Sequence, residues 1–342
     1  MKAGLFDKNS RSIVLALILL IVATIVPPLN LPRNTFDYIV IFDISQSMGV
    51  EDYELAGAPV SRLDYARAAT RTALRQLPCG SKVGWGIFAE YRALLLLSPV
   101  EVCGNYNDLL ASLDNIDGRM RWGNASEITK GVYWSMRAAK DVEGRPSVLF
   151  ITDGQEAPPL DPDNPPQMFD DLKPGELNGW LMGAGGETPQ RIPRIDDNGQ
   201  RVGFWKSYEV LQRFGGGTSE DPSAQPREHV SAIHESHLKQ LARQVGFGYM
   251  RLSGPASISE AMRDSRFARR TLAPTEVFWV PALLALILLA LRFRPALNAT
   301  GSFGATRAAR YSAGARAARS SLERERLARG TLQVPSTPGP AE

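Results

Sequence analysis

The stretch Asp37-Tyr-Ile-Val-Ile-Phe-Asp43-Ile-Ser45-Gln-Ser47 decides the fold of this chain. Its first half consists of β-branched and aromatic residues, which favour a buried strand. A carboxylate and two hydroxyls, spaced two residues apart, follow directly, and ligands of open α/β sheets bind beyond the carboxyl ends of the strands. Such oxygens are the ligands that Mg²⁺ and Ca²⁺ prefer, but three are too few to complete the coordination of either ion. The stretch therefore predicts part of a metal site.

Two later segments supply oxygens of the same kinds. Gly123-Asn-Ala-Ser126 places a hydroxyl at the expected start of a helix, and Ser147-Val-Leu-Phe-Ile-Thr-Asp153 ends a second hydrophobic strand in a carboxylate. One short motif of common residues would mark a turn or a helix cap at least as readily as a metal. Three pieces in this order favour the metal site instead. The expected ligands are Asp43, Ser45, Ser47, Ser126 and Asp153.

This order of motifs resembles the von Willebrand factor A family, in which a DxSxS motif, a later Thr and a later Asp form a metal-ion-dependent adhesion site. The match departs from the family at Ser126, which keeps the hydroxyl of the usual Thr but lacks its methyl group. The resemblance implies an α/β, doubly wound and mostly parallel sheet, a bound Mg²⁺ or Ca²⁺, and a protein partner whose acidic residue completes the coordination of the ion. Binding would then be reversed by chelation.

Five segments carry a narrower resemblance: Asp43–Met48, Pro59–Asp64, Leu77–Ser81, Pro99–Cys103 and Thr152–Pro158. They resemble the methanol-oxidation accessory proteins of the MxaL type. The order of two apolar segments around the domain is similar to that of the bacterial membrane-anchored members of the family. This resemblance implies a role in the maturation or metal loading of a periplasmic enzyme of the methanol-dehydrogenase type. The implied partners are a MoxR-type AAA+ ATPase and other membrane-anchored von Willebrand factor A proteins. The alternative within the group is an envelope stress or aerotolerance complex.

Both ends of the chain carry apolar segments. No charged residue lies between Arg11 and Arg33, and we expect a transmembrane helix over residues 12–30. A cleaved signal peptide is the alternative, but no small-residue cleavage site follows and the apolar run ends in two prolines. Residues 277–291 form a second apolar run, which is short for a span but extends to 272–291. A buried core helix is the alternative there.

The distribution of charge predicts the orientation of the chain. The first eleven residues carry a net charge of +2 and residues 292–342 carry +6, so that of the total of +3 the residues between hold −5. Because basic flanks stay in the cytoplasm, we expect the domain, residues 33–265, in the periplasm and the two spans in a bacterial inner membrane. The basic character belongs to the ends, which excludes nucleic-acid binding by the domain. The tail 292–342 is expected to be disordered.

The two cysteines bear on the same compartment. Cys79 lies just before the strand expected at Val83–Ala89, and Cys103 lies just after the strand expected at Ala93–Leu97. If the two strands pair as a hairpin, the sulfur atoms can meet. A disulfide that closes a loop of about 25 residues would contribute about 3 kcal/mol and persists only in an oxidising compartment. The alternative is two unpaired buried thiols.

Strands and helical patterns alternate through the domain, which predicts a parallel-dominated sheet with helices on both faces. The expected helix Arg62–Leu77 follows Ser61, whose hydroxyl can cap it together with Asp64. The long insertion 185–233 contains Asp197-Asn-Gly199, which predicts a projecting hairpin. The expected strands are Tyr38–Phe42, Val83–Ala89, Ala93–Leu97, Val148–Thr152, Gly179–Gly183 and Gly248–Leu252, and a last helix is expected at Ser236–Val245.

Motifs for catalysis are few. His234 and His237 lie three residues apart and His229 is close to them, but no carboxylate or cysteine adds the third ligand of a zinc set. A GxSxG nucleophile motif is absent, and Gly183-Ala-Gly185-Gly186 leads to a proline rather than to the helix of a dinucleotide site. We therefore expect a protein-binding module and not an enzyme. A membrane-bound hydrolase that uses the cation to activate water is the remaining alternative.

Overall fold

The structure is a computed structural model that describes residues 8–161, 163–196, 198–206, 209 and 229–299. The chain divides into two compact units. One combines Met1–Leu29 with Glu276–Glu342, and the other is formed by Asn30–Thr275. Most of the tail 292–342 falls outside the described residues, as does part of the long insertion 185–233.

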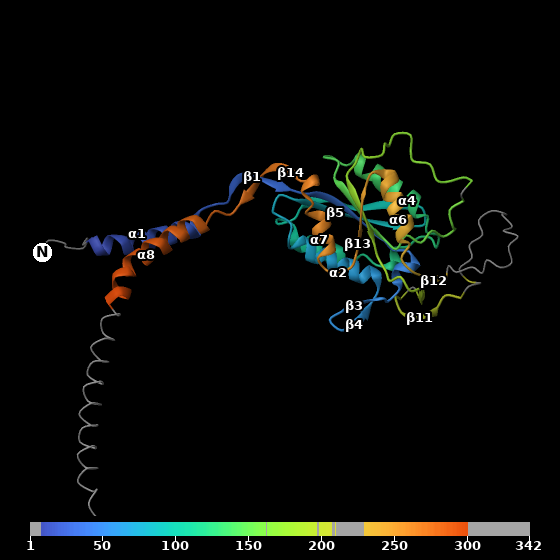
Figure 1. Cartoon of the computed structure of the whole chain (residues 1–342), viewed down its shortest axis with the longest axis horizontal. Coiled ribbons are helices and arrows are strands. Elements are labelled where there is room, and N and C mark those ends of the chain that lie inside the picture. Colours follow the sequence, from blue (N-terminus) through green and yellow to red (C-terminus); the bar gives the residue numbers. More distant parts are fainter. Residues whose placement is uncertain (1–7, 162, 197, 207–208, 210–228, 300–342) are drawn as a thin grey trace, which may run out of the picture. The chain divides into compact units, whose positions relative to one another are not determined.

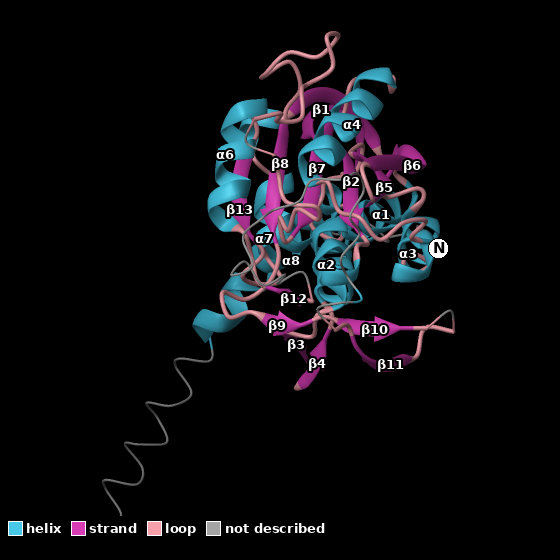
Figure 2. Cartoon of the chain, turned by 90° about the vertical axis from the view of Figure 1, so that its right-hand side faces the viewer, coloured by secondary structure: helices cyan, strands magenta, loops and turns pink. Residues whose placement is uncertain are grey.

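A six-stranded sheet forms the centre of the larger unit (Figure 1). Its strands lie side by side in the order β13-β8-β7-β2-β5-β6 (Figure 2). All neighbours are parallel except β5 and β6, which are antiparallel. The predicted mostly parallel sheet is therefore confirmed. The strands cover Asp37–Asp43 (β2), Lys82–Ala89 (β5), Arg92–Glu101 (β6), Ser147–Thr152 (β7), Gly179–Gly183 (β8) and Gly248–Arg251 (β13).

The side chains of β2 alternate between two hydrophobic cores, one on each face of the sheet. Tyr38, Val40 and Phe42 are fully buried in one core, and Ile39 and Ile41 in the other. Because successive residues of a strand point to opposite faces, helices must cover both. Each fully buried aliphatic or aromatic side chain stabilises the fold by roughly 1.5–3 kcal/mol. The first core includes side chains of α2 (Arg62–Leu74), α3 (Tyr106–Asp114) and α7 (Ser257–Met262), and the second those of α4 (Ile128–Asp141) and α6 (Glu235–Val245).

Helix α2 begins where the sequence predicts. The hydroxyl of Ser61 accepts a hydrogen bond from the backbone N–H of Asp64 at 3.0 Å, which caps the first turn. The helix ends at Leu74, before the predicted end at Leu77. Its first residue, Arg62, is fully buried, which is unusual for a charged side chain.

Helix α4 approaches the sheet closely because Gly131 has no side chain. A Cβ atom at this position would lie 2.3 Å from Cε2 of Phe88 in β5, a distance that no carbon pair tolerates. The absence of a side chain therefore lets the start of α4 lie beside the end of β5. This brings the loop before α4 to the carboxyl edge of the sheet.

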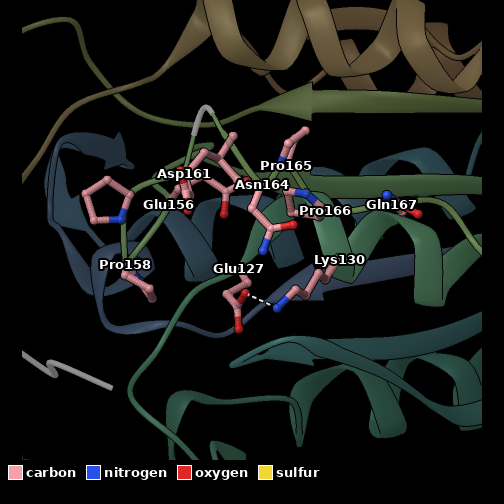
Figure 3. Close-up of a pocket in the computed structure, with 11 residues that line it drawn as sticks. Glu127, Lys130, Glu156, Pro158, Asp161, Asn164, Pro165, Pro166 and Gln167 are labelled. Atoms are coloured by element: carbon pink, nitrogen blue, oxygen red, sulfur yellow. Dashed lines mark ion pairs between the residues drawn. The ribbon is translucent and has the colours of Figure 1, made fainter. Parts of the chain in front are cut away.

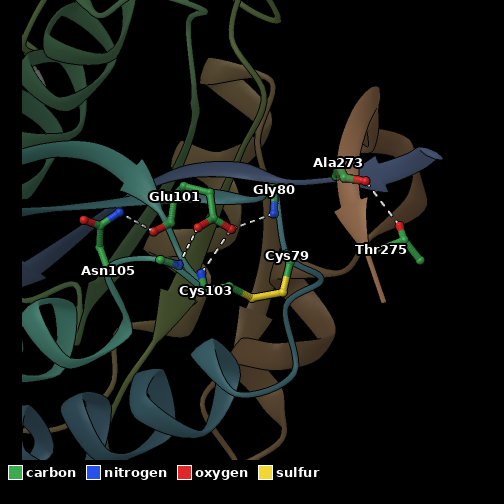
Figure 4. Close-up of a disulfide and its surroundings, with 8 residues drawn as sticks. Cys79, Gly80, Glu101, Cys103, Asn105, Ala273 and Thr275 are labelled. Carbon is green, nitrogen blue, oxygen red and sulfur yellow. Dashed lines mark hydrogen bonds between the residues drawn. A yellow bond between two sulfur atoms is a disulfide. The ribbon is translucent and has the colours of Figure 1, made fainter. Parts of the chain in front are cut away.

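A disulfide lies beside the antiparallel pair of β5 and β6 (Figure 4). Cys79 is bonded to Cys103, with their Cα atoms 5.3 Å apart, so the predicted pairing is present. Glu101 accepts hydrogen bonds from the backbone N–H groups of Gly80, Cys103 and Gly104 at 2.6 to 3.1 Å. Burial raises the pKa of Glu101, but the three donors outweigh burial and lower this pKa overall.

Short strand pairs surround the sheet. β1 and β14 pair with each other, and the hydroxyl of Thr35 donates to the carbonyl oxygen of Arg269 at 3.2 Å. The pairs β3–β4, β10–β11 and β9–β12 lie below the six strands in Figure 2. The hairpin expected around Asp197-Asn-Gly199 corresponds to β10–β11, although residue 197 itself lies outside the described residues. The bounds are Leu29–Thr35 (β1), Tyr53–Leu55 (β3), Ala58–Val60 (β4), Gln190–Arg191 (β9), Pro193–Ile195 (β10), Arg201–Phe204 (β11), Val230–Ser231 (β12) and Arg269–Thr275 (β14), with single helical turns at Gln46–Gly49 (η1), Gly118–Met120 (η2) and Ser265–Phe267 (η3).

The smaller unit contains two helices that pack against each other, α1 (Lys8–Ile25) and α8 (Trp279–Ala299). Many of their apolar side chains are exposed. The sequence predicts transmembrane helices over 12–30 and 272–291. In the part of the chain that the structure describes, however, no helix combines the length and the apolar character needed to cross a membrane.

Candidate metal centre

Three segments of the chain meet at the carboxyl ends of β2, β5 and β7. Asp43 is the last residue of β2 and lies in register with the end of β5. Thr152, the last residue of β7, donates its hydroxyl to Oδ2 of Asp43 at 2.7 Å and directly precedes Asp153. Ser126 forms a bridge with Glu90, the residue that follows β5. The fold thus brings the three predicted motifs to one edge of the sheet, while the binding of an ion there stays a prediction.

Asp43 occupies the centre of this edge and is fully buried. Its Oδ1 accepts a hydrogen bond from the backbone N–H of Ser45 at 2.8 Å, and its Oδ2 accepts the bond from Thr152. Burial, followed by repulsion from Asp153, raises the pKa of Asp43 from 3.8 to about 7 despite these hydrogen bonds. A divalent cation would stabilise the ionised form that the protein alone disfavours.

The two serines of the first motif lie together. Ser45 and Ser47 are both buried, and their Oγ atoms are 3.1 Å apart. The turn η1 carries Ser47 and is tied to the loop before α4, because Nε2 of Gln46 donates to Oδ1 of Asn124 at 2.6 Å. The hydrogen bond between Gln46 and Asn124 holds the first and second motifs next to each other.

Ser126 lies in an extended segment, whereas the sequence predicts it at the start of a helix. Its backbone N–H donates to the carbonyl oxygen of Ala157 at 2.7 Å, and its own carbonyl oxygen accepts from the N–H of Ala157 at 2.8 Å. Helix α4 begins only at Ile128. These two backbone bonds explain the difference, since they are bonds of a strand pair and not of a helix.

The hydroxyl of Ser126 is available to act as a metal ligand. Its Oγ is buried, and among the described residues it has no hydrogen-bond partner. Leaving a buried hydroxyl without a partner costs about 1–3 kcal/mol. A hard cation at this edge would give the hydroxyl a partner, and the set of carboxylate and hydroxyl oxygens suits such an ion.

Asp153 is fully buried as well, and both of its oxygens accept hydrogen bonds. Oδ2 accepts from Nη1 of Arg62 at 2.8 Å and from Oγ of Ser231 at 2.7 Å, and Oδ1 accepts from the backbone N–H of Gln155 at 3.0 Å. Sequence reasoning assigns no role to Arg62 or Ser231. Arg62 does lie in the Pro59–Asp64 segment that carries the family resemblance, which is the one signal that could have found it.

A second arginine lies at the same edge. Nη1 of Arg121 approaches the carbonyl oxygen of Ile44 at 3.5 Å. Burial lowers the pKa of Arg121, and the charge of Asp43 acts in the opposite direction. The loop that carries Arg121 therefore brings a positive charge toward the edge, where an acidic partner group would be attracted.

A groove of about 350 Å³ is lined by Glu127 and Pro158, the residues that directly follow Ser126 and its backbone partner Ala157 (Figure 3). One wall carries Glu127, which forms an ion pair with Lys130, and Glu156. Oε1 of Glu156 accepts hydrogen bonds from the N–H and the hydroxyl of Thr129 at 2.9 and 2.6 Å. The rest of the groove is lined by Pro158, Pro159, Leu160, Asp161, Asn164, Pro165, Pro166 and Gln167. The groove offers an acidic, proline-rich surface next to the candidate metal centre.

One cluster elsewhere contains residue types that bind metals. Cys79, Glu101 and Cys103 have potential ligand atoms within 4.8 Å of one another. The two sulfur atoms are bonded to each other in the disulfide, so the cysteines of this cluster form a crosslink and not a metal site. Of the three histidines considered above, His237 places Nε2 at 3.1 Å from Oε1 of Glu156, in the wall of the groove.

Comparison with known families identifies the type of domain. Residues 38–155 match the model of the von Willebrand factor type A domain. The matched segment contains all five predicted ligands and every strand that carries them. Residues 38–155 therefore form part of a von Willebrand factor A domain, and the larger unit has the α/β fold and the mostly parallel six-stranded sheet expected from the sequence.

Similar proteins are distant. A UPF0353 protein of Mycobacterium bovis (strain BCG / Pasteur 1173P2) is 24% identical over 259 residues, which cover 72% of this chain and 71% of the relative. An aerotolerance-related membrane protein from Bacteroides fragilis is similar in structure with a TM-score of 0.43 and 17% identity, covering 66% of this chain and 96% of that one. An uncharacterised membrane-spanning protein from Vibrio fischeri has a TM-score of 0.27 and 17% identity, over 67% of this chain and 94% of that one. The names of these three proteins do not mention methanol oxidation.

Proposed function

We propose that this protein is a non-enzymatic module that binds another protein through a divalent cation, Mg²⁺ or Ca²⁺. The observation that carries the proposal is the buried hydroxyl of Ser126, which has no hydrogen-bond partner among the described residues and lies at the edge where Asp43 and Asp153 also lie. Asp43, Ser45, Ser47, Ser126 and Asp153 would hold the ion. The ion would supply a positive charge with at least one coordination position left for another group.

The group expected at that position is a carboxylate of the partner. The chain's own residues bury the site and fix the positions of the oxygens through backbone and side-chain hydrogen bonds, as the bonds to Asp43 and Asp153 illustrate. In such a partly dry setting, a partner Asp or Glu is attracted more strongly than it would be in water. The neighbouring groove would accommodate residues that flank the partner's acid.

The disulfide supports a setting outside the reducing cytosol. The bond between Cys79 and Cys103 persists where thiols are kept oxidised, such as the bacterial periplasm. We further propose that the smaller unit attaches the domain to a lipid bilayer. Its exposed apolar side chains, among them Leu17, Ile25 and Leu286, would be costly to leave in water. The whole chain should then sediment with membranes after alkaline extraction, whereas a chain limited to Asn30–Thr275 should not.

Two assembly roles remain as finer proposals. One is the maturation or metal loading of a periplasmic enzyme of the methanol-dehydrogenase type, with a MoxR-type AAA+ ATPase and other membrane-anchored von Willebrand factor A proteins. The other is an envelope stress complex of the aerotolerance type. The maturation role has no counterpart among the names of the relatives described above. The aerotolerance role does, in the name of the membrane protein from Bacteroides fragilis. We therefore propose the envelope complex as the role to test first.

A cross-linked pull-down tests the main proposal. The whole chain is captured from membranes in Mg²⁺ or in EDTA, and compared with Asp43→Ala and with Asp37→Ala, which removes a carboxylate from the opposite end of the same strand. A partner that is recovered in Mg²⁺ by the native chain and by Asp37→Ala, but lost in EDTA and with Asp43→Ala, supports the proposal. Metal-dependent hydrolysis by the purified chain, without a metal-dependent partner, would favour the hydrolase instead.

A further inference from the structure

A fully buried arginine lies behind the candidate metal centre. The guanidinium of Arg62 donates from Nη1 to Oδ2 of Asp153 at 2.8 Å. The other side of the same group faces Asp52, with Nε at 3.0 Å from Oδ1 and Nη2 at 2.7 Å from Oδ2. Arg62 therefore contacts both Asp153, which is a predicted metal ligand, and Asp52, which is not a predicted ligand.

The surroundings are built to receive this guanidinium. Gly185 adopts a φ of +114°, and a Cβ atom there would lie 2.7 Å from Cζ of Arg62, so only glycine leaves room. The N–H of Gly186 donates to Oδ2 of Asp52 at 2.8 Å and fixes the carboxylate. Nη1 and Nη2 of Arg62 also donate to the hydroxyl and the carbonyl oxygen of Ser231 at 2.6 and 3.3 Å. Four segments of the chain thus hold one buried charge in place.

The position of Arg62 changes the charge that an ion would meet. Asp43 and Asp153 together would balance a divalent cation, but the charge of Asp153 is already partly balanced by Arg62 at 2.8 Å. An ion at this edge would keep part of its positive charge, which favours an acidic group in its open position. Asp52, in turn, offsets the charge of Arg62 from the far side and limits its repulsion of the ion.

We infer that the Asp52–Arg62 pair sets the charge of the metal centre. Arg62 leaves part of the positive charge of the bound cation unbalanced, so that the cation binds a carboxylate. Asp52 offsets enough of the charge of Arg62 for the cation to bind. This inference rests on the proposed function and goes beyond it by assigning a positioning and charge-setting role to two residues that do not bind the ion. Arg62 and Asp52 act through Asp153 and not through contact with the metal.

The inference predicts shifts of opposite sign for two variants. Asp52→Asn keeps an acceptor for Arg62 but removes the opposing charge, so the field of Arg62 at the centre increases. We expect the affinity for Mn²⁺, used as the probe ion, to fall about tenfold. The double variant Asp52→Asn with Arg62→Gln removes both charges and leaves two groups that can hydrogen-bond to each other. Asp153 then loses its positive neighbour, and we expect the affinity for Mn²⁺ to rise about tenfold above that of the native chain.

The matched control is Glu51→Gln, which removes one negative charge from the adjacent residue. Glu51 is paired with Arg201 at 2.8 Å in an exposed position, where solvent screens its charge, so we expect less than a twofold change. Affinities are measured on the whole chain in detergent by calorimetry and by the electron paramagnetic resonance of free Mn²⁺. Thermal unfolding in EDTA reports the folding of each variant.

The outcomes separate this inference from the proposed function. A loss of Mn²⁺ binding in Asp43→Ala, together with opposite shifts in the single and double variants, supports both. If Asp43→Ala abolishes binding but the single and double variants both match Glu51→Gln, or both shift in the same direction, the pair has only a structural role and the inference fails alone. If Asp43→Ala still binds Mn²⁺ as the native chain does, the metal centre itself is refuted.

Discussion

In the metal-free protein, Asp43→Asn should increase stability near and above neutral pH. The native carboxyl is fully buried, and burial with repulsion from Asp153 raises its pKa from 3.8 to about 7. Each pKa unit corresponds to about 1.4 kcal/mol, so ionised Asp43 costs the folded state on the order of 4 kcal/mol. Asn keeps the shape of the side chain and one of the two acceptor oxygens, which receive hydrogen bonds from Ser45 and Thr152 in the native protein, but it cannot ionise.

The sign of the pH dependence follows from the direction of this shift. Below about pH 4 the carboxyl is protonated in both the folded and the unfolded chain, so it contributes no difference. Between about pH 4 and 7 the unfolded chain releases the proton while folded Asp43 retains it, and the free energy of unfolding falls as the pH rises. Above about pH 7 the full cost is present and constant.

The assay is urea unfolding in EDTA at several pH values from 5 to 8, for the native chain and for Asp43→Asn. The difference in stability between the two should grow from pH 5 to about pH 7 and then level off. Excess Mg²⁺ should stabilise the native chain and leave the variant unchanged, because the ion binds only the folded, ionised site. Asp37→Asn, at the other end of β2, serves as the control and should not remove the slope. Equal slopes for the native chain and Asp43→Asn would refute the reasoning.

Three further outcomes are expected. Replacing Cys79 and Cys103 together by serine should lower the free energy of unfolding by about 3 kcal/mol, because the crosslink spans 24 residues. A reductant should lower the free energy of unfolding of the native chain by the same amount and leave that of the variant unchanged. Ser126→Ala should leave the metal-free stability unchanged or slightly higher, since its Oγ has no partner among the described residues, yet weaken Mn²⁺ binding measured by calorimetry; unchanged affinity would remove this residue from the site. Gly131→Ala should lower the unfolding midpoint, with a cost of about 1–3 kcal/mol, because its Cβ would meet Phe88 at 2.3 Å; a neutral result would show that α4 can shift.

The central strands could be predicted because they carry their own signal. β2 and β7 are continuous runs of buried residues, as a parallel strand covered on both faces must be. Their polar ends, Asp43 and Asp153, then identify the carboxyl edge of the sheet. The cap at Ser61 was equally local, since its partner lies three residues away.

Arg62 could not be predicted from local pattern. An arginine in the first turn of a helix normally points into water, and its burial here depends on partners that lie 10 and 91 residues away, Asp52 and Asp153. Ser126 shows the same limit, because its extended backbone depends on Ala157 from another loop. Such long-range pairs leave no periodic trace in the sequence.

The pairing of β1 with β14 has a practical consequence. Thr35 and Arg269 lie in contact, so the polypeptide enters and leaves Asn30–Thr275 at one corner. The seven residues of β2, at about 3.3 Å per residue, put the opposite edge roughly 20 Å away from that corner. Grafting either terminus of the excised domain to a chip or a fluorophore would thus leave the proposed cation-binding rim unobstructed, and two labels attached there would report on each other at short range.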